Sequence, residues 1–457
     1  MPSIPVVQYA SRTDVGMRRA ANQDSLAVRL CPDFEEWQRC GHLFVVADGM
    51  GGHAVGDLAS RIAVDTLPHA YFKQDAPSIE SRMRQAVQTA NKAINDRGRE
   101  NREFEGMGTT CSVLSLAESG AYVGHVGDSR VYRVRQNRIE QLTFDHSLQW
   151  EMIRLGRATI ENVELFHPRN VITRCLGPDP AVQIDVEGPF SIEAGDHFVL
   201  CSDGLTNHVS DTEIGQIVAS LPPAESSRLL INLANCRGGS DNSTVVVAEI
   251  TSYPKTLPEQ TAAAVKNRSH GETIDAPRRN ASLPKLLLAV TAVLCLLGAI
   301  LLLVLFSDKK IPSAILIIAA VLSWLISHRM KEKSSRKLVG NIPNSESIPT
   351  IGPNDSSSDP SPAPPPVPKT PFNLRSPYRI MDAGISEALL SQLAEMQSDL
   401  TQTARDSAWD VDFTEITILS RQANSARQSG QLDRSIKSRA KAIDMLMREM
   451  YSRSRSI

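Results

Sequence analysis

Short apolar runs separated by turn residues fill most of the first 250 positions of the chain. Runs of strand length lie at residues 44–47, 111–116, 197–200 and 245–247. Apolar positions at helical spacing indicate helices at residues 58–66, 78–98 and 211–220. The pattern predicts that residues 1–252 form a domain built from both strands and helices.

The hydrophobic pattern changes after residue 252. Residues 253–284 are polar and flanked by proline, which is typical of a linker. Residues 286–306 then form a run of twenty-one positions without a charge, long enough for a helix to cross about 30 Å of hydrocarbon. A second apolar run of seventeen positions, residues 311–327, follows after four residues. We predict a tight transmembrane hairpin over residues 285–327.

Basic residues on the two outer flanks predict the orientation of this hairpin. They are Arg278, Arg279, Lys285, Arg329, Lys331, Lys333, Arg336 and Lys337. Because positive residues are retained in the cytoplasm, this pattern predicts a multi-pass protein of the inner cell membrane with both ends cytoplasmic. Lys309 and Lys310 in the short loop oppose this orientation but are fewer. The alternative, one span followed by a re-entrant segment, would place the tail outside.

The rest of the chain divides into a linker and a helical tail. Residues 328–380 are first basic and then rich in Pro and Ser, which predicts an extended linker. Residues 381–453 show helical spacing with a break at Gly430. That break resembles a helix-turn-helix repeat of the tetratricopeptide type, although one repeat rarely stands alone. We prefer a short helical bundle or coiled coil that associates with itself; either form would be an interaction module.

Overall charge and cysteine content narrow the function classes. The formal net charge is −2, so bulk electrostatics give no support for nucleic-acid binding. The seven cysteines are scattered without metal-type spacing and are expected to be reduced thiols of a cytoplasmic protein.

Three aspartates next to apolar runs are the main candidates for chemistry. Asp48 ends the run at residues 44–47, Asp203 follows the run at 197–200, and Asp241 precedes the run at 245–247. Carboxylates at strand ends can converge on one rim of a sheet, where they repel one another unless hard cations lie between them. Oxygen-only ligands favour Mg²⁺ or Mn²⁺ over zinc or copper.

Three further segments complete the pattern. They are residues 13–25 with Asp24, residues 107–110 with the sequence Met-Gly-Thr-Thr, and residues 124–132 with Asp128. In this order the motifs resemble the metal-dependent protein phosphatase family, the type 2C serine/threonine phosphatases, over about residues 1–252. The Asp-Gly-Met-Gly-Gly-His form of the motif that starts at Asp48 is similar to the bacterial branch.

The resemblance implies a fold and a metal site. The fold is α+β, an αββα sandwich of two mostly antiparallel sheets flanked by helices. Asp48 would bridge two Mg²⁺ or Mn²⁺ ions, with the Gly49 carbonyl on one of them and Asp203 and Asp241 on the other. Asp24 would bind metal-coordinated water, and Asp128 would recruit a third, weaker ion.

The resemblance also implies the chemistry. A hydroxide bridging the two ions would attack phosphorus directly, so no Cys or Ser nucleophile is required. Arg19 matches the family's phosphate-binding Arg, whose planar fork can hold two phosphate oxygens. Two positions depart from the usual pattern, because an acidic residue is replaced by Gln23 and a proposed proton-donating His by Met50. The general acid could be His53, His146 or a metal-bound water; for His53, the alternative is a role in capping the next helix.

The leading hypothesis is a phosphatase that removes phosphate from phosphoserine and phosphothreonine on proteins, anchored to the cytoplasmic face of the membrane. Its expected partners are phosphorylated proteins and a Ser/Thr protein kinase at the same membrane. Residues 150–177 are expected to form a flap beside the site, in which Arg174 meets substrate or forms a structural salt bridge. The competing hypothesis is a non-catalytic membrane scaffold or sensor whose phosphatase-like domain only binds partners.

Overall fold

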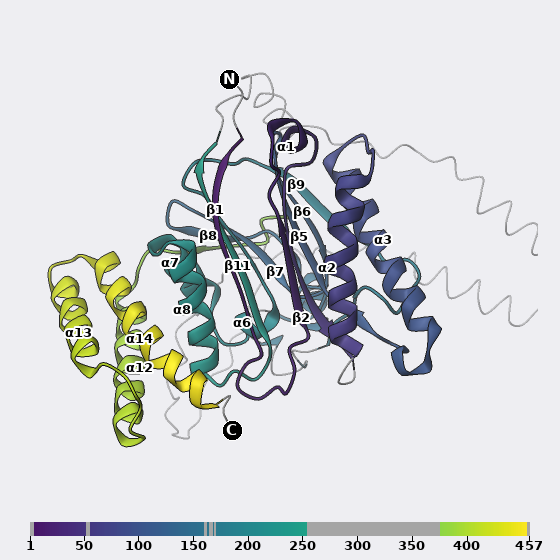
Figure 1. The fold of residues 1–457 in the computed structure, drawn as a ribbon. Coiled ribbons are helices and arrows are strands. Elements are labelled where there is room, and N and C mark those ends of the chain that lie inside the picture. The colour runs from purple at the N-terminus through teal and green to yellow at the C-terminus, as the bar shows by residue number, and fades with distance from the viewer. Residues whose placement is uncertain are drawn as a thin grey trace, which may run out of the picture. The chain divides into compact units, whose positions relative to one another are not determined.

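The computed structural model describes residues 4–51, 55–159, 162–163, 168, 171–253 and 375–454 (Figure 1). The predicted transmembrane hairpin, His53 and most of the two predicted linkers lie outside these residues. The end of the second linker was predicted too late, because residues 375–380 belong to the folded unit. Among the helices that the structure does describe, none combines the length and the apolar character needed to cross a bilayer.

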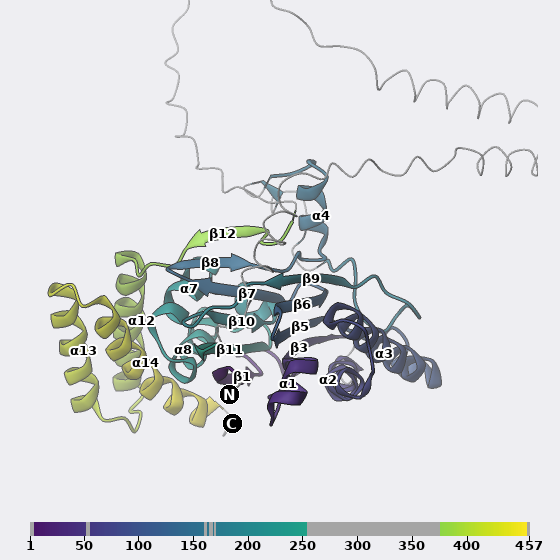
Figure 2. The ribbon, with the colours of Figure 1, turned by 90° about the horizontal axis from the view of Figure 1, so that it is seen from above.

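Two antiparallel sheets form the centre of the structure (Figure 2). The first sheet runs in the order β1 (Val6–Asp14), β11 (Ser243–Ser252), β10 (His197–Cys201), β7 (Arg130–Arg135), β8 (Arg138–Gln141) and β12 (Arg379–Asp382). The second runs β2 (Asp24–Arg29), β3 (His42–Met50), β5 (Cys111–Ala117), β6 (Gly120–Val126) and β9 (Asp185–Phe190), with the short β4 (Gly108–Thr109) paired to β3. The predicted α+β sandwich is thereby confirmed.

Alternation along the strands explains how the sheets pack. Val246 on β11 lies in the core between the two sheets, together with Phe44 and Val46 of β3. The side chains of the adjacent residues point to the opposite face of each sheet. Val245 therefore packs between the first sheet and its helices, and Val45 packs between the second sheet and its helices. Strands buried on both faces are continuously apolar, and the run at residues 245–247 has this pattern.

Helices cover both outer faces of the sandwich. The second sheet is covered by α1 (Phe34–Cys40), α2 (Val55–Lys73) and α3 (Ile79–Glu100), and the first by α7 (Asp211–Ser220) and α8 (Pro223–Cys236). The shorter elements are the 3₁₀ turn η1 (Arg102–Phe104), α4 (Leu148–Arg154) and α6 (Asp203–Thr206). The predicted helix at 211–220 coincides with α7, and α3 begins directly after its N-cap Ser78. The sequence patterns did not predict α8.

The C-terminal tail folds onto the domain that precedes the linkers. Strand β12 pairs with β8, so the tail extends the first sheet by one strand. The helices α12 (Glu387–Asp406) and α14 (Leu432–Ser454) share an apolar core with α7 and α8, in which Leu393 and Ile443 of the tail are fully buried together with Leu230 of α8. Figure 1 shows the tail helices beside α7 and α8. The tail is thus part of the same compact unit, an arrangement that its amphipathic pattern did not predict.

The tail itself is a small helical bundle. Helix α13 (Phe413–Gln428) packs on α14, and Gly430 between them adopts a left-handed conformation with φ of 75°. Glycine reaches this conformation without the steric cost of a side chain, which suits it to the end of a helix. The predicted break at Gly430 is confirmed, while the partner of the bundle is the chain's own domain.

Candidate active site

Strand register brings the predicted acidic residues to one end of the sandwich. Asp24, the first residue of β2, lies directly opposite Asp48 on β3. Asp203 follows the end of β10, while Asp241 and Asp128 precede the starts of β11 and β7. Because β10 is antiparallel to both β11 and β7, the end of β10 and the two starts meet at the same edge. Five carboxylates from distant stretches of the chain therefore gather in one place.

Glycines allow the loops that carry these carboxylates to approach closely. A Cβ atom at Gly204 would lie 1.9 Å from the carbonyl oxygen of Asn242, and one at Gly16 would lie 2.3 Å from that of Asp241. Both distances are far below van der Waals contact, so no other residue fits there without moving backbone. The Asp-Gly pair at 203–204 is thus more than a turn, because its glycine lets the Asp203 segment pack against the Asp241 segment.

Burial and mutual repulsion raise the pKa values of Asp24, Asp48, Asp128 and Asp203. Burial, followed by the charges of Asp24, Asp203, Asp128 and Asp241, raises the pKa of Asp48 well above its usual value. Burial raises the pKa of Asp24 to about 7, against the hydrogen bonds from Ser202 and Thr244 that lower it. Burial also raises the pKa values of Asp128 and Asp203. So many buried acids in one place need either protons or cations to balance their charge.

The donor atoms fit divalent cations. One carboxylate oxygen of Asp24 and one of Asp128 are buried without a hydrogen-bond partner among the described residues. No group of three or more Asp, Glu, His or Cys side chains within the described ranges has the arrangement of a finished metal site. The site therefore supplies hard oxygen ligands at which water would complete the coordination of Mg²⁺ or Mn²⁺.

The Met-Gly-Thr-Thr motif holds the backbone of Asp48. The Asp48 N–H donates to Thr110 Oγ1 at 2.9 Å, and the Asp48 carbonyl accepts from the Thr110 N–H at 2.8 Å and from Thr109 Oγ1 at 2.9 Å. Thr110 Oγ1 also lies 2.7 Å from the hydroxyl of Ser129, next to Asp128. The motif thereby links the segments that carry Asp48 and Asp128, which explains its place among the sequence signals.

Ser202 and Asn242 are positioning residues that the sequence analysis did not single out. Ser202 Oγ donates to Asp24 Oδ2 at 2.7 Å and accepts from the Thr244 N–H at 2.9 Å. The Asn242 amide donates to the carbonyls of Val15 and Ala21 and accepts from the Gln23 N–H, so it orders the loop before Asp24. Both residues directly adjoin a candidate metal ligand in the sequence, which is the signal that could have identified them.

The candidate phosphate-binding residue is close to the cluster. Arg19 is about half exposed and its Nη2 donates to Asp241 Oδ2 at 2.8 Å. The guanidinium thus already lies at the mouth of the acidic site, with a carboxylate in the place that a phosphate oxygen would take. Gln23, at the position where the family often has an acid, has its side-chain nitrogen buried without a hydrogen-bond partner among the described residues.

Of the candidates for the general acid, only His146 can be placed. Its ring is fully buried, with Nδ1 accepting from the Gly127 N–H at 3.0 Å and Nε2 lying 3.0 Å from Asp185 Oδ2. Both ring nitrogens are therefore engaged, and the ring fixes the turn before Asp128 rather than facing substrate. Arg174 forms an ion pair with Asp185 at 3.1 Å, so the structural alternative predicted for it is the one observed.

A buried ion network joins the site to the tail. Arg130, two residues after Asp128, pairs with Asp145 at 2.6 Å and with Asp211 at 3.0 Å. Asp211 also receives Arg379 of β12 at 2.7 Å. Removing one partner of a buried ion pair leaves the other charge uncompensated. By supplying Arg379, the docked tail therefore helps to stabilise the network next to the Asp128 segment.

Comparisons with known proteins agree with this geometry. The family model of protein phosphatase 2C matches residues 17–227. The chain is 36% identical to protein phosphatase PhpP of Streptococcus pneumoniae over 244 residues, which are 52% of this chain and 95% of that protein. It is 38% identical to the serine/threonine phosphatase stp of Listeria monocytogenes over 245 residues, which are 52% of this chain and 94% of that protein.

A solved structure with a similar sequence is the catalytic domain of the serine/threonine protein phosphatase PstP in complex with two manganese ions. It is 33% identical, covers 55% of this chain and 100% of its own, and superimposes with a TM-score of 0.47. Motif order, sandwich fold and sequence relatives together show that the chain belongs to the protein phosphatase 2C family, the metal-dependent serine/threonine protein phosphatases.

Proposed function

We propose that this phosphatase hydrolyses phosphoserine and phosphothreonine on proteins by direct attack of water, without a phosphoenzyme, at the end of the sandwich where Asp24, Asp48, Asp128, Asp203 and Asp241 meet. The observation that carries the proposal is the gathering of these acids, in which one carboxylate oxygen of Asp24 and one of Asp128 are buried with no hydrogen-bond partner in the part of the chain that the structure describes. These acids would hold two divalent ions, Mg²⁺ or Mn²⁺, with a third at Asp128, and the bound ions would supply the Lewis acidity that activates water near neutral pH.

The chain's own residues supply binding and orientation. Asp48, Asp203, Asp241 and the Gly49 carbonyl would hold the ions, and Asp24 would orient water. Arg19 can turn from Asp241 to a phosphate oxygen, since the two groups present similar acceptors to its planar fork. The transition state spreads negative charge over three equatorial oxygens, and this guanidinium would stabilise it. His53 remains the candidate proton donor to the leaving alkoxide.

Metal removal tests the catalytic proposal. The purified full-length protein is expected to release phosphate from a phosphothreonine peptide in Mn²⁺ or Mg²⁺, and EDTA should abolish the release. Re-addition of Mn²⁺ should restore it, because strand pairing and hydrogen bonds such as that from Ser202 to Asp24 hold the carboxylates in place. Activity that persists after exhaustive chelation would contradict the proposal, and a complete lack of turnover in either metal would favour the competing scaffold hypothesis.

We further infer that residues 285–327 anchor the enzyme to the membrane as a hairpin with the catalytic domain and tail in the cytoplasm. Support comes from the folded segments that precede and follow the predicted hairpin. Tyr253 is hydrogen-bonded to the carbonyl of Ala117, and Tyr378 is hydrogen-bonded to Glu187, so both segments belong to one folded body. A chain that leaves and rejoins the same body has to cross a membrane an even number of times. This argument favours the hairpin over the single span. Phosphorylated cytoplasmic proteins and an opposing Ser/Thr kinase at the same membrane are the expected partners.

The topology has a direct test. Epitope tags fused before residue 1 and after residue 457 are both expected to be protected from protease in intact spheroplasts and cleaved after lysis. A periplasmic control protein should be cleaved in both samples. Cleavage of the C-terminal tag alone in intact spheroplasts would identify a single span and contradict the hairpin.

A further inference from the structure

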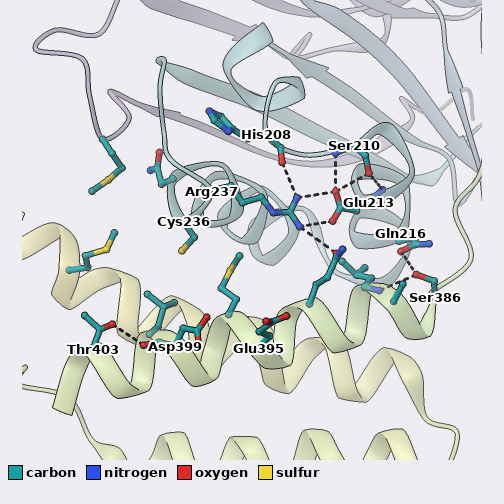
Figure 3. Close-up of a pocket in the computed structure, with 18 of the residues that line it drawn as sticks. His208, Ser210, Glu213, Gln216, Cys236, Arg237, Ser386, Glu395, Asp399 and Thr403 are labelled. Carbon is teal, nitrogen blue, oxygen red and sulfur yellow. Dashed lines mark hydrogen bonds and ion pairs between the residues drawn. The ribbon is translucent and has the colours of Figure 1, made fainter. Parts of the chain in front are cut away.

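A groove of about 940 Å³ separates the docked tail from the catalytic domain. Helix α12 forms one wall, and the other comes from α7, the end of α8 and the loops that follow α6 and β1. Figure 3 shows Glu395 and Asp399 on the α12 side of this groove and His208, Glu213 and Arg237 on the other. The groove exists because the tail is docked, so it is a feature of the tail as much as of the catalytic domain.

One end of the groove lies beside the active site. Met17, which lines it, precedes Arg18 and Arg19 in the sequence, and its N–H donates to the Gly239 carbonyl at 2.8 Å. His208 also lines it, and its Nε2 lies 2.9 Å from the hydroxyl of Ser240, the neighbour of Asp241. A polypeptide whose phosphorylated residue is held at Arg19 would therefore meet the groove with its flanking residues.

The charges of the groove are unbalanced. Glu213 is satisfied by Arg237 at 2.6 Å. Glu395 and Asp399 line the groove at i and i+4 on α12, and neither side chain has an ion-pair partner among the described residues. Like charges at this spacing destabilise a helix, so a bound cation would relieve the repulsion between them. The burial of His208 lowers its pKa, so the imidazole adds no compensating charge near neutral pH.

Between these charges the lining is apolar and adaptable. It includes Met17, Met396, Leu400, Trp409 and Met450. Methionine side chains are flexible and polarisable, and they are common at surfaces that accept varied partners. A groove with an acidic wall and a methionine-rich lining is suited to a segment that alternates basic and apolar residues.

We propose that this groove binds the polypeptide segment that flanks the phosphorylated residue of the substrate protein, and that it selects segments rich in Arg or Lys with apolar residues between them. This inference rests on the proposed function, since it extends the same site. Glu395 and Asp399 are the specificity-determining residues, and they act on substrate binding without taking part in the reaction. The tail thereby gives the enzyme a sequence preference that its catalytic motifs do not encode.

The test compares substrates with and without basic flanks on the full-length protein in detergent. Three phosphothreonine peptides would carry an Arg-Leu-Arg segment before the phosphothreonine, the same segment after it, or Ala in its place. p-Nitrophenyl phosphate, which has no flanks, reports on the reacting centre alone. The double variant Glu395→Gln/Asp399→Asn removes the charges, and Asp406→Asn, on the same helix but outside the groove, is the matched control.

The wild type is expected to prefer one of the basic peptides over the Ala peptide by about fivefold in kcat/KM, through KM, as two partly exposed charge contacts would provide. The double variant should lose this preference and keep its turnover of p-nitrophenyl phosphate, while Asp406→Asn should behave as wild type. Equal kcat/KM for all three peptides in the wild type would overturn the proposal, as would an unchanged preference in the double variant. A wild type that hydrolyses no substrate would instead overturn the proposed function, and the inference with it.

Discussion

Asp48→Asn is expected to reduce turnover of p-nitrophenyl phosphate in Mn²⁺ by roughly a thousandfold or more, which corresponds to about 4 kcal/mol of transition-state stabilisation. Asp48 lies directly opposite Asp24 in the β2–β3 pair, and the charges of the four other acids add to burial in raising its pKa. Asparagine keeps the size of the side chain but removes the charge that would hold two cations together. Steady-state kinetics across a range of Mn²⁺ concentrations measure the effect.

Although Asp48→Asn should reduce turnover, it is expected to stabilise the metal-free protein against unfolding. Burial raises the pKa of Asp24 to about 7 and that of Asp48 well above its usual value. Between about pH 4 and 7 the folded state thus holds protons that the unfolded state releases, so the free energy of unfolding falls as the pH rises. In EDTA, Asp48→Asn should raise the melting temperature at pH 7.5, because a buried amide carries no charge and needs no proton uptake on folding. It should also weaken the pH dependence.

The control is Asp96→Asn, which removes an exposed carboxylate of α3 that pairs with Lys92 on the same helix. It should retain wild-type turnover and wild-type pH dependence of melting. Wild-type activity in Asp48→Asn would exclude the assigned metal site. A metal-free Asp48→Asn protein less stable than wild type at pH 7.5 would mean that the carboxylate is stabilised by groups other than cations.

Leu393→Ala is expected to destabilise the protein by about 3 kcal/mol and to weaken the docking of the tail. Leu393 is fully buried in the core that α12 and α14 share with α7 and α8, so its loss leaves a cavity there. Chemical denaturation followed by circular dichroism measures the change. Ile418→Ala is the matched control, because Ile418 lies on α13 and is 48% exposed, and it should change the free energy of unfolding by less than about 0.5 kcal/mol.

Loss of tail docking should also weaken substrate binding at the active site. The amide of Asn235 donates to the hydroxyl of Tyr451 in the tail and also to Asp14. Asp14 accepts a further hydrogen bond from the Gly16 N–H, at the start of the loop that carries Arg19. Arg379 contributes to the buried network around Arg130. Leu393→Ala is therefore expected to raise KM for phosphopeptides at temperatures where the protein is still folded. If Leu393→Ala changed neither the free energy of unfolding nor KM, the tail would not share a core with the catalytic domain.

Local patterns in the sequence determined much of this architecture. Apolar periodicity located α3 and α7, and the glycine at 430 marked the end of α13, because helix spacing and helix termination depend on residues within a few positions of one another. Asp48, Asp203 and Asp241 could be assigned to one rim because each flanks an apolar run and strand ends meet at sheet edges, whereas Asp24 and Asp128 were assigned by resemblance to the family. For these features short-range chemistry is sufficient.

Only the tertiary structure decided which distant surfaces meet. The amphipathic patterns of α12 and α14 predict that one face of each helix is buried. The same apolar stripe would result whether that face packs against a second copy, another protein or the chain's own α7 and α8. Ser202 and Asn242 likewise gain their roles from partners that are more than 170 residues away in the sequence. The groove beside α12 follows from the same docking, because its two walls face each other only when the tail packs against the catalytic domain.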